Sequence, residues 1–334
     1  MDSRDRVIKT IKFDSPDRLP IDMWIIPAAY KKYGKILYDI LWENPIDFVR
    51  IENRLVINDN NHVFETGTYT DSWGCVWNNV HDGICGQVKK FPLNNINLVY
   101  LYKAPLEHVK MGWEDIDKQI ENAEDKFVIC SQVNPFERMQ FLRGTENLFM
   151  DLAYGGKEVY LLRDIVWDYF DKMIDEWLKH QRIDAVAFTD DWGNQQSLLI
   201  SPNLWREFFK PMYKSMIDKV KKEGKYVFFH SDGNIFDIYK DMIELKVDAI
   251  NSQIWCMDIN KIAERFAGKI TFWGELSRQT VLPFGNPEDI RKSAEIMIKN
   301  LYTGKGGLIG QCEIGPDVPL NNIKAAVTCW NIEI

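Results

Sequence analysis

The sequence contains no apolar run that approaches the ~18 residues needed to cross a membrane. Residues 1–20 are rich in charge and lack the apolar core of a secretion signal, so we expect a soluble, cytoplasmic protein without membrane contact. Basic clusters are missing too. The formal net charge is −8, which argues against nucleic acid as a partner.

Paired cysteine motifs are also absent. The chain has six cysteines, but no two of them are separated by only two residues. Together with the lack of a secretion signal, this spacing predicts free thiols rather than disulfides. Most free thiols are small buried side chains. The six are Cys75, Cys85, Cys130, Cys256, Cys312 and Cys329.

What the sequence does contain is a repeated alternation of short apolar segments with longer amphipathic stretches, such as residues 158–181 and 204–224. Alternation repeated eight times predicts an α/β protein whose strands form a (β/α)8 TIM barrel. We expect one domain over residues 1–334 and no internal repeat or linker. The eight strand candidates are residues 19–26, 47–53, 126–132, 184–193, 225–233, 247–255, 270–277 and 307–315.

Residues 54–108 break this alternation. They alternate polar and apolar side chains and are rich in turn residues, as in "HVFETGTYTDSWGCVWNNVHDG". This pattern is typical of paired antiparallel strands. We therefore expect a β-hairpin excursion inserted after the second strand of the barrel.

Polar side chains cluster at the C-terminal ends of strands four to eight. Active sites of TIM barrels are built at these ends, so we expect the side chains to converge on one mouth. The residues are Thr189, Asp190, Asp191 and Trp192, then His230, Ser231 and Asp232, then Asn251, Ser252 and Gln253, then Glu275, and finally Gln311, Cys312 and Glu313.

Each of these residues also has a purely structural interpretation. An aspartate can cap a helix, Glu275 can pair with Arg278, and a single histidine or cysteine is often part of a core. Taken together, however, a histidine, a cysteine and a carboxylate supply nitrogen, sulfur and oxygen donors. Three such ligands and one open position are typical of catalytic zinc.

Several stretches resemble the uroporphyrinogen decarboxylase superfamily. They are "HSDGNI", "VDAINSQ", "TFWGELSRQTVLPFGNPEDIRK" and "GGLIGQCEIGPDVPLNNIKA", which follow one another within residues 180–330, and "RLPIDMW" near the start. The resemblance implies that residues 1–334 form a single barrel domain of the uroporphyrinogen decarboxylase type.

One branch of this superfamily decarboxylates acidic tetrapyrroles and carries an arginine-rich loop after the first strand. Here that position reads "IIPAAYKKYGK" and contains no arginine. A substrate with many carboxylates needs cationic partners, because burying unpaired charges is costly. The departure argues against porphyrin decarboxylation.

The other branch comprises zinc-dependent methyltransferases that exchange methyl groups with a corrinoid carried by a separate protein. Their usual zinc pattern is His-x-Cys and a distal Cys, which His230 and Cys312 match, whereas Asp232 replaces the middle cysteine. The resemblance implies zinc bound by His230, Cys312 and Glu275. Asp232 is the alternative third ligand or a partner that orients His230. The missing thiolate disfavours a thiol substrate and favours a methyl ether, an amine or a similar donor.

The remaining mouth residues complete this interpretation. Asp190, Asp191 and Asp232 are candidate catalytic groups, and Asn251 and Gln253 are candidate hydrogen-bonding partners of the substrate. Trp192 and Trp273 are expected to line the pocket together with Trp73, Trp77 and Trp255, although packing alone would also explain these large aromatic side chains. The predicted function is zinc-dependent methyl transfer from a small-molecule donor to a corrinoid (cobalamin) cofactor on a corrinoid-binding partner protein. The alternatives are a decarboxylase-like lyase and a non-catalytic barrel that binds small molecules.

Overall fold

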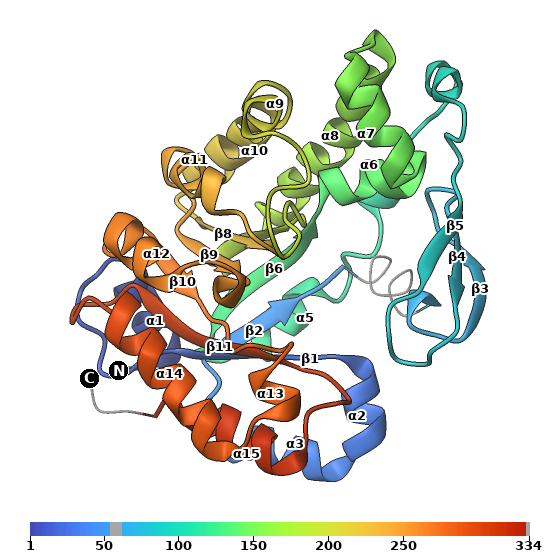
Figure 1. Cartoon of the computed structure of the whole chain (residues 1–334). Coiled ribbons are helices and arrows are strands. Elements are labelled where there is room, and N and C mark those ends of the chain that lie inside the picture. Colours follow the sequence, from blue (N-terminus) through green and yellow to red (C-terminus); the bar gives the residue numbers. More distant parts are fainter. Residues whose placement is uncertain (54–61, 332–334) are drawn as a thin grey trace.

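The computed structural model describes residues 1–53 and 62–331, with side chains for all of these except 131 and 132. Eight parallel strands form one sheet in the order β1-β11-β10-β9-β8-β7-β6-β2, which curls into a barrel (Figure 1). The strands are β1 (Ile21–Ile25), β2 (Phe48–Ile51), β6 (Phe127–Val133), β7 (Ala185–Thr189), β8 (Tyr226–Ser231), β9 (Ala249–Ser252), β10 (Thr271–Trp273) and β11 (Leu308–Ile314). All eight predicted strands are confirmed, and so is the TIM-barrel class.

The sheet forms a nearly closed barrel. Its two end strands in the strand order are β1 and β2. Asp47, which precedes β2, joins them at the N-terminal end. Its backbone N–H donates to the carbonyl of Ile21 at 2.9 Å, and its carboxylate accepts from the N–H of Ile21 at 2.8 Å. Arg50 of β2 also pairs with Asp22 of β1, with a distance of 2.6 Å between Nη2 and Oδ2.

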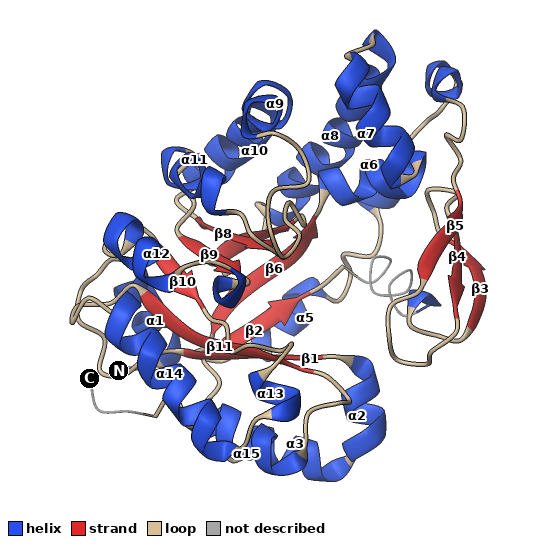
Figure 2. Ribbon diagram, viewed as in Figure 1, coloured by secondary structure: helices blue, strands red, loops and turns tan. Residues whose placement is uncertain are grey.

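Helices surround the strands, as Figure 2 shows. The α-helices are α1 (Ser3–Ile11), α2 (Pro27–Tyr33), α3 (Lys35–Trp42), α5 (Ile116–Glu121), α6 (Pro135–Arg143), α7 (Thr145–Tyr154), α8 (Lys157–Trp177), α9 (Pro202–Leu204), α10 (Lys210–Lys222), α11 (Tyr239–Glu244), α12 (Ile259–Phe266), α13 (Val281–Phe284), α14 (Pro287–Leu301) and α15 (Leu320–Thr328). Short helical turns lie at η1 (Ile96–Tyr100), η2 (Leu106–Lys110), η3 (Trp205–Phe209), η4 (Phe236–Ile238) and η5 (Ile254–Cys256). No helix of the described residues is both long enough and apolar enough to span a membrane.

Local sequence explains where these helices begin and end. Asn286 caps α14 by accepting from the backbone N–H of Asp289, whose side chain accepts in return from the N–H of Asn286. Pro287 occupies the first turn, where its missing N–H costs nothing. Gly224 ends the α10 segment with a φ of +70°, a conformation that glycine adopts readily.

The insertion after β2 is a three-stranded antiparallel sheet of β3 (Gly67–Thr70), β4 (Val76–Asn79) and β5 (Gln87–Lys90). The predicted excursion is confirmed in place and carries one strand more than a hairpin. Its residues 54–61 lie outside the described residues. The carbonyl of Gly83 accepts from the N–H of Ala28 in α2 at 3.0 Å, so the insertion is attached beside the end of β1.

Two apolar layers fill the molecule, and alternate residues of each strand belong to different layers. Phe228 of β8, Trp273 of β10 and Ile309 of β11 belong to the inner cluster inside the barrel, which Val7 of α1 also joins. Their neighbours along the strands, such as Phe229, belong to the outer layer beneath the helices. Because strand side chains alternate between faces, this phase decides which residues reach the barrel mouth.

Candidate metal centre at the barrel mouth

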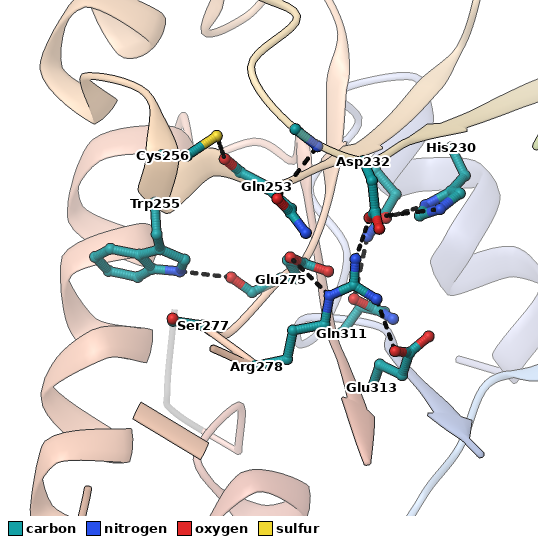
Figure 3. A network of polar contacts seen from close by, with 12 residues as sticks. His230, Asp232, Gln253, Trp255, Cys256, Glu275, Ser277, Arg278, Gln311 and Glu313 are labelled. Carbon is teal, nitrogen blue, oxygen red and sulfur yellow. Dashed lines mark hydrogen bonds and ion pairs between the residues drawn. The ribbon is translucent and has the colours of Figure 1, made fainter. Parts of the chain in front are cut away.

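Three side chains at the C-terminal ends of β7 and β8 could hold one metal ion. His230 lies near the end of β8, Asp232 follows the same strand, and Asp191 follows β7. One potential ligand atom from each lies within 4.8 Å of the others. The Nε2 atom of His230 is 3.5 Å from Asp191 Oδ1 and 3.7 Å from Asp232 Oδ1. Figure 3 shows His230 and Asp232 side by side.

Close contact between the loops after β7 and β8 brings the two carboxylates together. The N–H of Gly193 donates to the carbonyl of Asp232 at 3.1 Å, and the N–H of Asp232 donates to Asp191 Oδ1 at 2.8 Å. Gly233 has a φ of +77°, and a Cβ there would lie 2.2 Å from the carbonyl carbon of Gly193. A side chain at this position would push the loops, and with them the carboxylates, apart.

The orientation of the His230 ring is set by Asn251 on β9. His230 Nδ1 lies 2.5 Å from Asn251 Oδ1. The amide nitrogen of Asn251 donates to the carbonyl of Trp273 at 2.6 Å and to Gln311 Oε1 at 3.1 Å, so its oxygen must face the histidine. Nδ1 therefore carries a proton, and Nε2 is the ring nitrogen that faces the two aspartates.

Aromatic side chains and a buried ion pair support the ring from below. Trp24 packs edge-on against His230 with ring centroids 5.0 Å apart, and Trp273 packs against Trp24 at the same distance. Both indole N–H groups donate to Asp22 Oδ2, at 3.0 and 2.9 Å. Asp22 is fully buried and also binds Arg50 through two hydrogen bonds of 3.0 and 2.6 Å.

Arg278 links the carboxylates on the other side of the mouth, as Figure 3 shows. Its Nη2 atom forms an ion pair with Asp232 Oδ1, and its Nη1 atom donates to Glu313 Oε1 at 2.7 Å. Its Nε atom lies 4.0 Å from Glu275 Oε1. These carboxylates raise the pKa of the guanidinium above its ordinary value despite partial burial.

Burial alters the protonation of three acids around the centre. It raises the pKa of Glu275 to about 8, which Asp232 and Glu313 reinforce and Arg278 opposes. It raises the pKa of Asp191, whose ionised form His230 and Arg278 favour. Burial and the nearby Asp191 and Asp190 raise the pKa of Glu137 in α6 well above its ordinary value.

The described residues line two cavities that open at the mouth. One of about 250 Å³ has Trp255, Glu275 and Arg278 in its wall, and one of about 340 Å³ has Asp232, Arg278 and Glu313. Gln253, Arg278 and Gln279 line both. Small-molecule sites have this form, a hollow with a few convergent polar groups.

The model of the family described as uroporphyrinogen decarboxylase (URO-D) matches residues 106–331, well over half of the chain. The chain belongs to the uroporphyrinogen decarboxylase family. The predicted family is thus confirmed. No curated protein matches the sequence.

Among solved structures, a methyltransferase from Methanosarcina mazei is similar over 99% of this chain and 98% of its own, with 16% identity and a TM-score of 0.72. A chitinase from Chromobacterium violaceum has 10% identity and a TM-score of 0.44 over 94% of this chain and 99% of its own. The GH26 domain of an endo-beta-mannanase/endo-beta-glucanase from Prevotella bryantii has 10% identity and a TM-score of 0.45 over 98% of this chain and 94% of its own. At this level of identity the first likeness shows a shared fold.

Within this family fold, the structure assembles only part of the predicted metal site. His230 is at the mouth, but the described residues group it with Asp191 and Asp232 rather than with Glu275 and Cys312. Glu275 faces Arg278 in the adjoining cavity. Cys312 is on the outer face of β11, where its thiol lies 3.7 Å from the sulfur of Met23. The structure thus does not bring the three predicted ligands together, and for Cys312 the cause is the alternation of side chains along β11.

Of the other predicted site residues, some lie at the barrel mouth and others are buried away from it. Gln253 lines both cavities, whereas Asn251 is buried and holds His230. Asp190 points outward, where it accepts from the hydroxyl of Tyr213 at 2.5 Å and from the N–H of Glu137 at 2.9 Å. Burial raises its pKa to about 7.

Most of the tryptophans predicted to line the pocket lie away from the barrel mouth. Trp192 is fully buried in the outer layer, stacked on Phe136 at 3.8 Å, which corrects its predicted role in substrate binding. Trp273 lies inside the barrel beneath the site. Trp73 and Trp77 are buried in the insertion, and only Trp255 lines a mouth cavity.

Sequence reasoning missed the central role of Arg278 and the presence of Glu137. The sequence predicts Arg278 only as a local partner of Glu275. In the structure it also contacts Asp232, which follows β8, and Glu313 of β11. Glu137 lies four residues after the end of β6, and the β6–α6 connection carries no distinctive pattern. Asp22 and Trp24 lie in "RLPIDMW", where their alternation with apolar residues was the available signal.

The centre fits a divalent metal such as zinc. It offers one imidazole nitrogen with a free lone pair and two carboxylate oxygens, which are ordinary zinc donors. Asp232 Oδ1 is buried and pairs with a cation, the guanidinium of Arg278, so a positive charge is already accommodated at this oxygen. A set without thiolate is harder than the family pattern inferred from sequence.

Proposed function

We propose that the protein is a zinc-dependent methyltransferase that moves a methyl group from a small donor to a corrinoid on a partner protein. His230, Asp191 and Asp232 would hold the metal. The observation that carries the proposal is the free Nε2 of His230 facing two carboxylates at the mouth of a barrel of this family. The shared fold with a protein described as a methyltransferase supports it.

When bound, zinc would supply Lewis-acid polarisation of the heteroatom that carries the methyl group. Asn251 keeps the proton on Nδ1 of His230 and thereby keeps Nε2 available as a donor. Asp191 and Asp232 supply negative charge that compensates a divalent cation. The rigid strand ends of β7 and β8 fix these groups, which favours one orientation of the donor.

Glu275 is placed to handle the proton that a departing alkoxide or amine requires. Its carboxyl group borders the cavity of about 250 Å³, and its raised pKa of about 8 keeps it protonated at neutral pH. A carboxyl group with such a pKa is suited to general acid catalysis near neutrality. Glu275 thus gives up its proton to the leaving atom and becomes the anion that Arg278 stabilises.

The charge of the mouth disfavours the decarboxylase alternative. Among the described residues lining the two cavities, Arg278 is the only cation, and Asp232 and Glu313 already engage it. The lysines that follow β1 are also engaged: Lys31 pairs with Asp82, and Lys32 donates to the carbonyl of Pro316. Among the described residues of these two cavities, a tetrapyrrole rich in carboxylates would find no free cation.

The test is a screen of methyl ethers, methylamines and methyl thioethers with zinc-loaded protein and free cob(I)alamin as acceptor. We expect at least one donor class to convert cob(I)alamin to its methylated form, seen in the visible spectrum. His230→Ala should abolish the conversion, and Asn300→Ala, a change at a half-buried residue of α14 far from the mouth in sequence, should not. Conversion of uroporphyrinogen with no methyl transfer from any donor would instead support the decarboxylase alternative.

A further inference from the structure

Arg278 occupies an unusual position for the only cation of the mouth cavities among the described residues. Its side chain keeps 22% of its accessible surface and is surrounded by the carboxylates of Asp232, Glu313 and Glu275 (Figure 3). The Asp232 contact and the Glu313 contact use different terminal nitrogens. The guanidinium therefore joins the candidate metal centre to a second pair of acids.

The contact with Asp232 falls on the oxygen that faces the histidine. Asp232 Oδ1 is the atom in the ion pair with Arg278 Nη2, and the same atom lies 3.7 Å from His230 Nε2. It is buried, and the guanidinium is its cationic partner. A divalent cation shared by His230 and Asp232 would compete with the guanidinium for this oxygen, and the two positive charges would repel each other.

Arg278 has an alternative acidic partner and open space beside its side chain. Glu313 already accepts from Nη1 at 2.7 Å, so the guanidinium keeps a carboxylate partner after it leaves Asp232, and the carboxyl group of Glu275 lies 4.0 Å from Nε. Cavities border Arg278 on two sides and leave space for its side chain to turn. Neither feature is needed by an arginine that serves only as a fixed structural tie.

We propose that Arg278 is a displaceable counter-cation: it holds Asp232 in the metal-free protein and moves toward Glu313 and Glu275 when a metal binds Asp191, His230 and Asp232. The inference rests on the proposed metal site. Arg278 is then a positioning residue that keeps the empty site compact, because two facing aspartates without a cation would repel each other. The metal must break the contact between Arg278 and Asp232 when it binds, so the free energy of that contact reduces the apparent metal affinity.

The experiment measures zinc affinity of chelator-treated protein by competition with a coloured zinc indicator. Arg278→Gln should bind zinc about tenfold or more tightly than wild type, within the usual range of coupling between sites. Arg278→Lys keeps a charge near Asp232 and should change the affinity less. Arg265→Gln, an exposed arginine over the ring of Phe236, is the matched control and should leave the affinity unchanged.

A double-mutant cycle separates displacement from a general field effect. Glu313→Gln removes one destination of Arg278 and should weaken zinc binding in the wild-type background. In the Arg278→Gln background the same change should have little effect, because there is no guanidinium left to move. Additive effects of the two changes, or an Arg278→Gln affinity equal to wild type, would overturn the inference while leaving the metal site intact.

The outcomes also distinguish this inference from the proposed function. If wild type binds no zinc, or if His230→Ala binds it as well as wild type, the metal site itself is refuted and the role of Arg278 falls with it. Circular dichroism establishes that each variant is folded. If Arg278→Gln does not fold, Glu313→Gln in the wild-type background still decides, since unchanged or stronger zinc binding there contradicts displacement.

Discussion

His230 and Asn251 form a paired unit in which the amide fixes the imidazole. Asn251 Oδ1 lies 2.5 Å from His230 Nδ1, and the amide nitrogen is anchored by the carbonyl of Trp273 at 2.6 Å. Neither residue can turn without breaking a buried hydrogen bond, and the cost of an unsatisfied buried polar group is about 1–3 kcal/mol. The direction of the Nε2 lone pair is therefore a property of the barrel interior.

Replacement of Asn251 by alanine should weaken zinc binding by about 10- to 100-fold, the usual effect of losing a partner that orients a metal-binding histidine. Zinc competition with a coloured indicator measures this loss. Asn300→Ala removes an amide on α14 that donates to the carbonyl of Ile296 and should have no effect. An unchanged zinc affinity in folded Asn251→Ala would mean that the ring is positioned by Trp24 alone.

The stability of the metal-free protein should depend on pH through Glu275. Its folded-state pKa of about 8 lies above the ordinary value of 4.5, so the folded protein binds more protons than the unfolded chain between these values. Stability must then fall as the pH rises through this window, by at most roughly 3 to 5 kcal/mol from this group. Glu275→Gln removes the proton uptake and should flatten the profile.

Urea unfolding at pH 5, 6, 7 and 8 in the presence of a chelator gives this comparison. The free energy of unfolding of wild type should decline more steeply than that of Glu275→Gln over the series. Parallel profiles would show that Glu275 ionises normally in the folded protein, and its role as a proton donor would then lose its support.

The buried pair of Asp22 and Arg50 predicts a large stability effect. Asp22→Ala removes the partner of Arg50 and the acceptor of two indole N–H groups, which should cost about 3 kcal/mol or more of unfolding free energy. Asp39→Ala breaks an exposed pair with Lys35 on α3 and should cost less than about 1 kcal/mol. Thermal and urea unfolding measure both, and equal effects would contradict the structural importance of the pair.

The barrel itself could be predicted from the sequence because its signal is repeated. Eight apolar segments with amphipathic stretches between them allow few other arrangements, and the polar ends of strands four to eight indicated the mouth correctly. The insertion was recognised because its period-two pattern differs from its surroundings, but its third strand, Gln87–Lys90, is short and largely exposed and carried little signal.

The ligand set is harder to predict than the fold, because it depends on which face of the sheet each strand residue occupies. Residues 228, 249 and 309 face inward, so residues 230, 251, 311 and 313 do too, and Cys312 must face out. Strands that are apolar on both faces hide this phase. The spacing of polar residues at 230 and 232, or at 311 and 313, would have revealed it. Trp192 was misassigned for the same reason.

The contribution of Arg278 depends on three-dimensional convergence rather than on pattern. It lies three residues after Glu275, so a local ion pair was the natural expectation from sequence. Its contacts with Asp232 and Glu313 join residues that are 46 and 35 positions away, which only the folded barrel brings together.

The account's central claim is that Asp191, His230 and Asp232 hold one zinc ion, and metal content per chain tests it most directly. Elemental analysis of purified, zinc-reconstituted protein should find one zinc per chain in wild type and in Cys312→Ala, whose thiol lies against Met23 on the outer face. His230→Ala and the double variant Asp191→Ala/Asp232→Ala should lose it. Stoichiometric zinc in His230→Ala, or its loss from folded Cys312→Ala, would contradict the account.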